Sequence, residues 1–321
     1  MEEIEKILGE DLQEFRSMMK GLFAADEGLL ADVDSMVLSH GGKQLRPIFL
    51  LLVARICGNG NPGDARVLAT ATELLHNATL LHDDVADGSL LRRGNPTVNA
   101  LYGPSAAVLI GDHWLAHAFE IMQHCSNPLK CMDIYASILS DLARGEMFQL
   151  EKGIAADTTE EDYLKIIYCK TASLFENSCR LGSIAAGASA EETDNAAGFG
   201  RAYGLAFQIR DDIFDYLPSP HTGKPSGIDI LEHKITLPLL GAIKNSGRDA
   251  EIREKVLQID GEGALADEIR RFVLENDGIA YASRVLDEHI SRALSYLERL
   301  RPCQEREILK KLAMHNAIRE N

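Results

Sequence analysis

Two short segments of this chain repeat one acidic pattern, Asp-Asp-x-x-Asp, and this repetition constrains the fold more than any other feature. The segments are Asp83-Asp84-Val85-Ala86-Asp87 and Asp211-Asp212-Ile213-Phe214-Asp215. In a helix the first and fifth residues of such a segment lie one turn apart on one face, so their carboxylates repel each other. Both segments lie in apolar sequence, where unpaired acids are rare, so a cation is expected to neutralise them. Carboxylate oxygens suit Mg²⁺, which completes its coordination with water and substrate phosphate oxygens.

The remaining sequence has the apolar periodicity of helices, and strand-like alternation is scarce. Glycine and proline interrupt this periodicity at several places, which leaves roughly ten helices. The breaks fall at Gly41-Gly42, Gly58 to Gly63, Gly94 to Pro96, Gly103-Pro104, Pro128, Gly153, Pro218 to Gly227 and Gly261 to Gly263. We therefore expect an all-α fold, with a single domain over residues 1–321 whose helices surround a deep central cavity.

The charge and cysteine content of the chain limit the partners and the compartment that we expect. The net charge is −16, with 49 acidic against 33 basic residues, which argues against nucleic acid and anionic membranes as partners. No run approaches the ~18 apolar residues of a membrane span, so no transmembrane segment is expected. The six cysteines lack CxxC spacing, as in reduced proteins of the cytosol. We expect a cytoplasmic protein.

Clusters of basic and polar residues interrupt the helices and suit a diphosphate ligand. In the first, Gly41 and Gly42 allow close backbone approach to an anion, Lys43 supplies a point charge and Arg46 offers a bidentate fork. A plain turn before a helix explains this motif equally well. In the second, Arg92 and Arg93 follow the first acidic segment, so metal and guanidinium would bracket one phosphate. A surface ion-pair patch is the alternative there.

The other polar clusters are weaker signals when each is taken alone. They are Lys170-Thr171, Gln208 before the second acidic segment, and the loop from Gly223-Lys224 to Lys234. Ordinary loop or helix-end polarity explains each of them as well as a functional role does. His76 is expected to donate a hydrogen bond in the pocket, with a satisfied core histidine as the alternative.

Taken together and in order, these motifs resemble the trans-isoprenyl diphosphate synthases (polyprenyl synthetases). The resemblance covers residues 41 to 240 and rests on GGKQLRP at 41–47, LLHDDVAD at 80–87, LRRGNPTVN at 91–99, KTA at 170–172, FQIRDDIFDY at 207–216 and GKPSGID at 223–229. Two departures are small: Gly88 stands where an acidic residue is common, and His233 replaces a frequent glycine.

The resemblance implies an all-α fold around a deep cavity, a homodimer, and head-to-tail condensation of an allylic diphosphate primer with isopentenyl diphosphate. It implies three Mg²⁺ ions per active site, with metal ligands Asp83, Asp87 and Asp211 and supporting ligands Asp84, Asp212 and Asp215. The residues implied for the allylic diphosphate are Arg92, Lys170 and Lys234, and those for isopentenyl diphosphate are Lys43, Arg46, His76 and Arg93. Thr171 and Gln208 would flank the reacting carbons, and Lys224 would also contact substrate.

Product length is expected to depend on the helix before Asp83. Ala78 and Thr79 carry small side chains where bulky aromatic residues would resemble the floor of a short-product cavity. This leaves a long product, hexaprenyl to decaprenyl, with octaprenyl (C40) as the central expectation. A floor near Phe119 or Met147 would shorten the product. A farnesyl or geranylgeranyl diphosphate synthase, and a non-catalytic subunit of a heteromeric synthase, are the alternatives.

Overall fold

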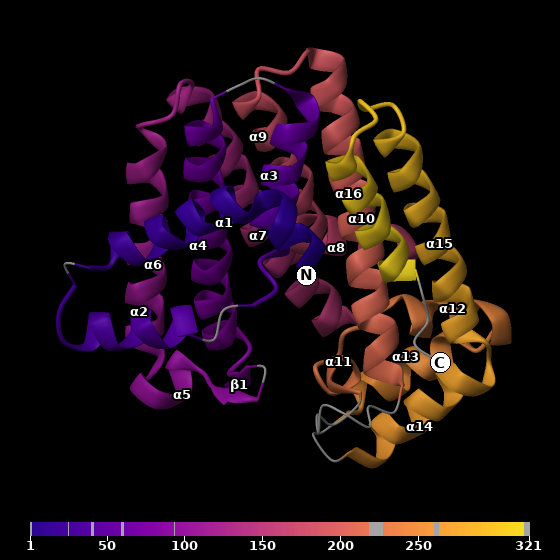
Figure 1. Cartoon of the computed structure of the whole chain (residues 1–321). Helices are drawn as coiled ribbons and strands as arrows, with labels where there is room; N and C mark the ends of the chain where they lie inside the picture. Colours follow the sequence, from indigo (N-terminus) through magenta and orange to yellow (C-terminus); the bar gives the residue numbers. More distant parts are fainter. Residues whose placement is uncertain are drawn as a thin grey trace. The chain divides into compact units, whose positions relative to one another are not determined.

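The structure, a computed structural model, describes residues 2–24, 26–39, 42–58, 61–92, 94–217, 227–259 and 263–317. These residues form α-helices almost throughout, with one π-helical turn and one hairpin whose two strands have two residues each (Figure 1). The elements are α1 (Glu2–Leu22), α2 (Leu29–Ser39), α3 (Leu45–Cys57), α4 (Pro62–Ala86), β1 (Leu91–Arg92), β2 (Asn95–Pro96), α5 (Val98–Tyr102), α6 (Pro104–Met122), α7 (Pro128–Ala155), α8 (Glu160–Ile167), η1 (Tyr168–Ala172), α9 (Ser173–Ala185), α10 (Ala190–Tyr216), α11 (Ile228–Leu231), α12 (Leu237–Ser246), α13 (Asp249–Leu257), α14 (Gly263–Glu275), α15 (Gly278–Leu297) and α16 (Gln304–Ala317). Within these ranges no helix has the length and apolarity needed to cross a membrane.

The all-α prediction is confirmed, and most of the predicted breaks separate helices. α5 ends at Tyr102 before Gly103, and α7 begins at Pro128. The break predicted at Gly153 falls two residues later, because α7 continues to Ala155 and the chain leaves the helix at Ala156, whose φ is 49°. A single glycine weakens a helix by only about 1 kcal/mol, which the surrounding turns outweigh.

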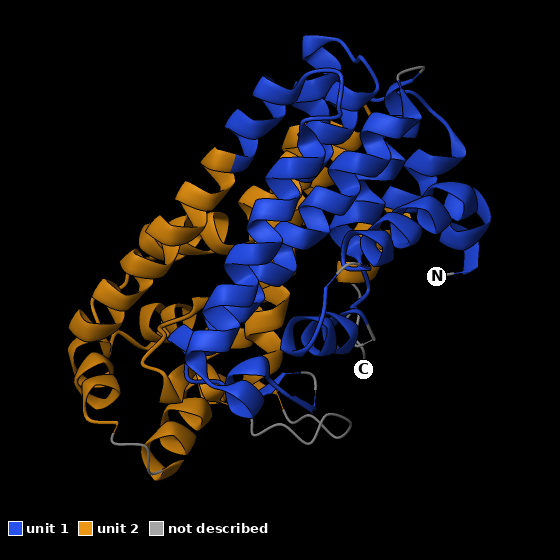
Figure 2. Cartoon of the chain, turned by 90° about the vertical axis from the view of Figure 1, so that its left-hand side faces the viewer, with its two compact units in different colours: residues 1–135, 178–196, 300–309 blue, residues 136–177, 197–299, 310–321 orange. Residues whose placement is uncertain are grey.

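The chain divides into two compact units, coloured separately in Figure 2. Unit 1 comprises residues 1–135, 178–196 and 300–309, and unit 2 comprises residues 136–177, 197–299 and 310–321. Four helices, α7, α9, α10 and α16, have residues in both units. The single domain expected over residues 1–321 stays a prediction.

In unit 1 the long helix α4 packs against α1, α3 and α6. Asn61 caps its first turn by accepting a hydrogen bond from Gly63 N at 3.0 Å, and Pro62 sets the first helical φ. The buried Asp11 of α1 accepts hydrogen bonds from Arg55 Nε of α3 and Arg66 Nε of α4, each at 2.8 Å. Burial of an acid is tolerated here because two guanidinium groups share its charge.

In unit 2 the apolar faces of α10, α12, α14 and α15 form one core, which includes Ile209, Leu239, Ile269 and Phe272. Helix α12 packs against both α14 and α15. Tyr216, fully buried at the end of α10, hydrogen-bonds Thr236 at 3.0 Å through its hydroxyl. This bond ties the residue after the second acidic segment to Thr236, which immediately precedes α12.

Candidate active site

The first acidic segment lies at the C-terminal end of α4 in unit 1. Asp84 is buried and accepts hydrogen bonds from Arg92, from Nε at 2.8 Å and from Nη2 at 2.7 Å. Asp83 is half-buried, and Asp87 is exposed just beyond the last helical turn. The carboxylate of Asp84 is thus hydrogen-bonded to Arg92, while the side chain of Asp87 is exposed to solvent.

A short hairpin, β1 paired antiparallel with β2, holds Arg92 over this helix end. Thr97 fixes the hairpin, donating from Oγ1 to Ser89 O at 2.8 Å and from its backbone N–H to Leu90 O at 3.0 Å. A pocket of about 80 Å³ lies beside it, with Asp84, Arg92, Asn77 and Leu80 among its walls. Arg93 lies outside the described residues.

The first basic cluster leads into α3 of the same unit. Arg46 Nη1 lies 3.0 Å from His76 Nε2, and because guanidinium groups only donate, His76 accepts this bond. The donor role predicted for His76 therefore does not apply to its Nε2 atom. Lys43 is exposed before α3.

Two positions predicted to govern product length lie on α4, within one turn after His76. Ala78 is fully buried, and Thr79 is half-buried with its hydroxyl donating to His76 O at 2.8 Å. A Cβ at Gly111 of α6 would lie 3.2 Å from Ala78 O. Helix α6 therefore approaches α4 closely at this turn.

The second acidic segment lies in the last turns of α10, in unit 2. The buried Asp212 accepts from Tyr163 Oη at 2.6 Å and from Gln208 Nε2 at 2.8 Å. Gln208 Oε1 in turn accepts from Thr171 Oγ1 at 2.7 Å. Burial raises the pKa of Asp212 well above its usual value, and the charge of Asp229 adds to the rise, while both hydrogen bonds oppose it. A continuous hydrogen-bonded chain therefore joins Thr171 to Tyr163.

The third carboxylate of this segment is held by backbone. Asp215 accepts from Ile228 N at 3.2 Å and from Asp229 N at 3.1 Å, at the first turn of α11. The pKa of Asp229 is raised to about 7, first by burial and then by the charge of Asp215, while Lys234 lowers it. Asp211 is exposed. The segment thus has one solvent-facing carboxylate and two that are fixed by hydrogen bonds.

A pocket of about 120 Å³ lies inside unit 2, against this segment. Its walls include Lys170, Gln208, Asp212, Asp229 and Lys234. Lys170 sits in the π-helical turn η1 and contacts Glu146 Oε1 at 2.5 Å and Gln149 Oε1 at 3.2 Å. Lys234 contacts Glu232 Oε2 at 2.5 Å. Lys224 lies outside the described residues.

Both acidic segments fit a hard cation through the chemistry of their oxygen donors. Within the part of the chain that the structure describes, no segment brings three carboxylates within 4.8 Å of one another. Mg²⁺ needs only one or two carboxylates, because water and phosphate oxygens fill its remaining positions. An exposed acid beside fixed ones, as at Asp211 and Asp87, meets that requirement.

Sequence reasoning missed two residues of this site. Tyr163 carries no motif, and its role depends on a contact with Asp212 that the sequence does not contain. Asp229 lies within the motif GKPSGID but was not assigned a role; its position beside Asp215 gives it one.

Comparison with known proteins places similar sequences in one family. The sequence profile of the polyprenyl synthetase family matches residues 27–272. An all-trans-nonaprenyl-diphosphate synthase (geranyl-diphosphate specific) from Rhodobacter capsulatus is 37% identical over 312 residues, covering 95% of each chain. The octaprenyl diphosphate synthase of Escherichia coli is 34% identical and covers 100% of this chain and 99% of its own. A short chain isoprenyl diphosphate synthase from Methanothermobacter thermautotrophicus is 35% identical over 86% of each chain.

Among solved structures, a polyprenyl synthase from Caulobacter crescentus CB15, complexed with calcium and isoprenyl diphosphate, superposes with a TM-score of 0.92. It is 32% identical, and the match covers 100% of this chain and 98% of that one. Relatives named for long and for short products therefore match most or all of this chain.

Proposed function

The chain belongs to the polyprenyl synthetase family, and from this premise we propose that it condenses isopentenyl diphosphate head-to-tail with an allylic diphosphate to make a long all-trans polyprenyl diphosphate. It is a prenyltransferase. The observation that carries the proposal is the second acidic segment, where Asp212 is fixed by Tyr163 and Gln208 while Asp211 remains exposed. This arrangement suits a carboxylate cluster that must present oxygens to a cation without rearranging.

Each unit contributes one acidic segment, and the aspartates of both segments are proposed to hold the metal. Asp83, Asp87 and Asp211 would bind Mg²⁺ directly, and three ions per site is the number we propose. Asp84, Asp212 and Asp215 would orient these ligands, because each accepts hydrogen bonds from its own neighbours. Bound Mg²⁺ would supply a Lewis acid that stabilises charge on the departing diphosphate.

The cationic side chains would bind the two substrates. Arg92, Lys170 and Lys234 would hold the allylic diphosphate, since negative charge grows on its leaving oxygen as the bond to carbon breaks. Lys43, Arg46 and His76 would hold isopentenyl diphosphate, with the Arg46–His76 contact of 3.0 Å aligning the guanidinium. Arg93 and Lys224 are proposed as further substrate contacts.

The hydrogen-bonded chain from Thr171 to Asp212 would face the reacting carbons. Thr171 donates to Gln208 Oε1, so the hydroxyl oxygen keeps its lone pairs for a developing allylic cation. The alkene of isopentenyl diphosphate is the nucleophile, so no activated side chain is required. The released diphosphate can accept the proton that is lost afterwards.

The experiment that tests this function is a product analysis. The purified protein is incubated with Mg²⁺, farnesyl diphosphate and radiolabelled isopentenyl diphosphate, and the dephosphorylated products are separated by length. We expect a ladder that ends near octaprenyl. Products that end at geranylgeranyl, or incorporation with geranyl diphosphate as primer but not with farnesyl diphosphate, would support the short-chain alternative. Absence of incorporation with either primer would favour a non-catalytic subunit.

Product length is proposed to depend on Ala78, with Thr79 beside it. Ala78→Tyr adds a ring at a fully buried position of α4, so products should become shorter by several isoprene units. Thr79→Ser keeps a small hydroxyl side chain and serves as the matched control, with product length expected to be unchanged. A folded Ala78→Tyr variant that makes the parental product would show that the floor lies elsewhere.

We propose that the partner is a second copy of this chain. Large apolar side chains are exposed on α5 and the start of α6, where Leu101 is 50% and Leu109 is 67% exposed. Such a surface is expected to be covered in a stable assembly. Light scattering of the parent should give the mass of a dimer, and Leu109→Glu should shift it toward the monomer. The proposed location is the cytoplasm.

A further inference from the structure

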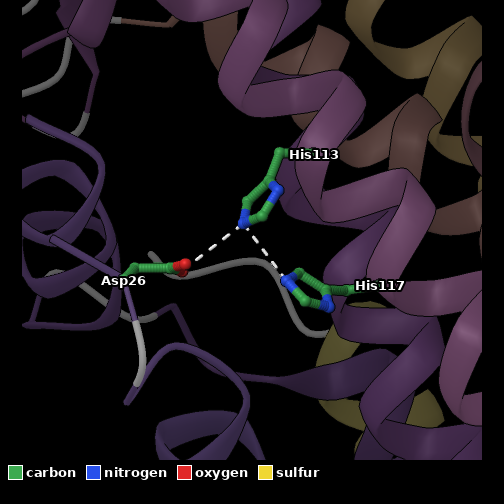
Figure 3. A group of neighbouring side chains, drawn as sticks. All are labelled: Asp26, His113 and His117. Atoms are coloured by element: carbon green, nitrogen blue, oxygen red, sulfur yellow. Dashed lines mark hydrogen bonds and ion pairs between the residues drawn. The ribbon is translucent and has the colours of Figure 1, made fainter.

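Three potential metal ligands meet in unit 1 that belong to neither acidic segment (Figure 3). Asp26 lies in the connection between α1 and α2, and His113 and His117 lie one turn apart on α6. His113 Nε2 is 3.4 Å from Asp26 Oδ2 and 3.1 Å from His117 Nε2. In the described ranges this is the only place where three such groups have ligand atoms within 4.8 Å of one another.

Hydrogen bonding outside the cluster prepares His117 as a ligand. His117 Nδ1 lies 3.2 Å from Glu120 Oε2, and because the carboxylate accepts, the proton of a neutral His117 ring resides on Nδ1. Its Nε2 then presents a lone pair toward His113. A carboxylate on the distal nitrogen is the usual partner of a metal-binding histidine, since it fixes the tautomer and the ring orientation.

Hydrogen bonds alone cannot pair all the acceptor atoms of this cluster. His113 Nε2 faces two acceptors, Asp26 Oδ2 and His117 Nε2, but carries at most one proton. A divalent cation at the centre would accept a lone pair from all three groups at once. The side chains keep access to solvent, with His113 30% and Asp26 15% exposed, so an ion can enter.

The distances suit Zn²⁺. Ligands placed tetrahedrally at about 2.1 Å from Zn²⁺ are about 3.4 Å from one another, close to the 3.4 and 3.1 Å found here. Two imidazoles and one carboxylate are ligands that Zn²⁺ binds well, and water can take the fourth position.

A second carboxylate adds negative charge behind the cluster. Asp34 of α2 is 98% buried, and its Oδ1 accepts from Trp114 Nε1 at 2.7 Å. Its Oδ2 receives no hydrogen bond from an N–H or hydroxyl group of the described residues. Burial raises the pKa of Asp34 to about 6, and Trp114 lowers it; a side-chain hydrogen bond and the charge of Asp26 raise it further, while the charge of His113 lowers it. Asp34 therefore lies within reach of both Asp26 and His113. A buried carboxylate with an unpaired oxygen is stabilised by a nearby cation.

We infer that Asp26, His113 and His117 form a binding site for a late first-row divalent cation, Zn²⁺ in the first instance. The bound ion would tie the α1–α2 connection to α6. Phe23 already packs there, stacked on Trp114 at 4.8 Å between ring centroids and edge-on to His117 at 5.8 Å. The site would therefore stabilise unit 1 independently of the proposed reaction.

The test uses the full-length protein, freed of metal by chelation and then kept in excess Mg²⁺ to occupy the acidic segments. Titration with Co²⁺ should produce one equivalent of the intense visible absorption of a four- or five-coordinate site, which Zn²⁺ abolishes. His113→Gln and His117→Gln each remove a ligand, so each should weaken Co²⁺ binding by more than the about 10- to 100-fold that loss of a ligand's hydrogen-bond partner costs. His124→Gln changes an exposed histidine outside the cluster and should bind as the parent does.

Thermal denaturation shows whether the variants fold. In chelator, both glutamine variants should melt near the parent; on adding Zn²⁺, only the parent and His124→Gln should gain several degrees, as expected for a ligand that binds the folded state alone. The inference is overturned if Co²⁺ gives no such absorption, or if His113→Gln and His117→Gln bind it as tightly as the parent.

Discussion

Asp212 is held in place by hydrogen bonds, and we propose that it supports the metal site in this way. Both of its oxygens accept short hydrogen bonds, from Tyr163 and Gln208, and its pKa is raised by burial. The charge of Asp212 is therefore easily lost to a proton unless a cation lies nearby. The sequence pattern identified Asp212 and Gln208, which lie one turn apart, but Tyr163 lies 49 residues earlier and only the tertiary fold brings it close.

Tyr163→Phe tests this positioning role. The change removes one hydroxyl from a fully enclosed contact, so Asp212 loses a hydrogen bond while the packing of the ring remains. We expect kcat to fall by about 10- to 100-fold and the Mg²⁺ concentration for half-maximal rate to rise. Tyr135→Phe removes a buried hydroxyl that lies in unit 1 and should leave the Mg²⁺ dependence unchanged. An unaltered Mg²⁺ dependence in Tyr163→Phe would contradict the role.

The carboxyl of Asp229 predicts how stability depends on pH. Its pKa is 3.8 when unperturbed and about 7 in the folded protein, so between these values the folded state binds more protons than the unfolded state. The free energy of unfolding therefore falls as pH rises from about 4 to about 7. Asp229→Asn cannot titrate, so its stability relative to the parent should increase by at least about 1 kcal/mol from pH 5 to pH 8.

Urea denaturation at the two pH values, in chelator, measures this difference for Asp229→Asn. The exposed Asp133 provides the control, because Asp133→Asn should follow the parent at both values. Parallel stability profiles for the parent and Asp229→Asn would rule out the proposed cause.

His233 occupies a conformation that favours glycine. Its φ is 59°, and its Nδ1 donates to Val256 O at 2.9 Å. His233→Ala keeps the strained φ and loses the bond, so it should destabilise the protein by about 1 kcal/mol. His233→Gly loses the same bond but relieves about 1 kcal/mol of strain, so it should be nearly neutral in urea denaturation. A glycine variant less stable than the alanine variant would contradict this explanation.

At the scale of elements, the π-helical turn η1 could not be predicted from the sequence. The sequence analysis gives Lys170 and Thr171 a role with substrate, with ordinary helix-end or loop polarity as the alternative, and predicts no backbone conformation for them. In the structure both lie in Tyr168–Ala172, a turn between α8 and α9 whose hydrogen bonds span five residues. Such a turn shifts the face on which later residues lie. It has no residue signature of its own, because neighbouring packing stabilises it.

A close approach of α9 to α3 gives a prediction for a glycine. A Cβ at Gly182 would lie 2.3 Å from Leu50 O, a backbone atom that cannot move alone. Alanine normally favours a helix by about 1 kcal/mol over glycine, but overpacking here should reverse the sign. We expect Gly182→Ala to lower the free energy of unfolding by about 2 kcal/mol.

The matched control is Gly9→Ala, in the interior of α1, where no atom lies within 4 Å of the added Cβ. That variant should gain about 0.5–1 kcal/mol. Equal effects of the two substitutions in urea denaturation would show that packing at Gly182 is looser than its distances require.

At the scale of the molecule, the helical class and the acidic segments followed from the sequence because both depend on local spacing. Asp83 and Asp87 share a helix end as their spacing required. The Asp26–His113–His117 cluster was not predicted, although the spacing of the two histidines was visible, because Asp26 lies 87 residues from His113. Contacts of that separation depend on how α1, α2 and α6 pack, which periodicity does not specify.

The single domain expected over residues 1–321 predicts one unfolding transition. Residues of α7, α9, α10 and α16 are divided between the units, and helix fragments shorter than ~12 residues are marginal in water. Unfolding of one unit should therefore destabilise the other.

The only tryptophan of the chain, Trp114, is fully buried in unit 1, so its fluorescence reports unfolding of that unit, while far-ultraviolet circular dichroism reports unfolding of both. The two signals should change at the same urea concentration in the parent and, shifted together, in Gly182→Ala. Fluorescence that changes well before the circular dichroism would mean that the units unfold as separate domains.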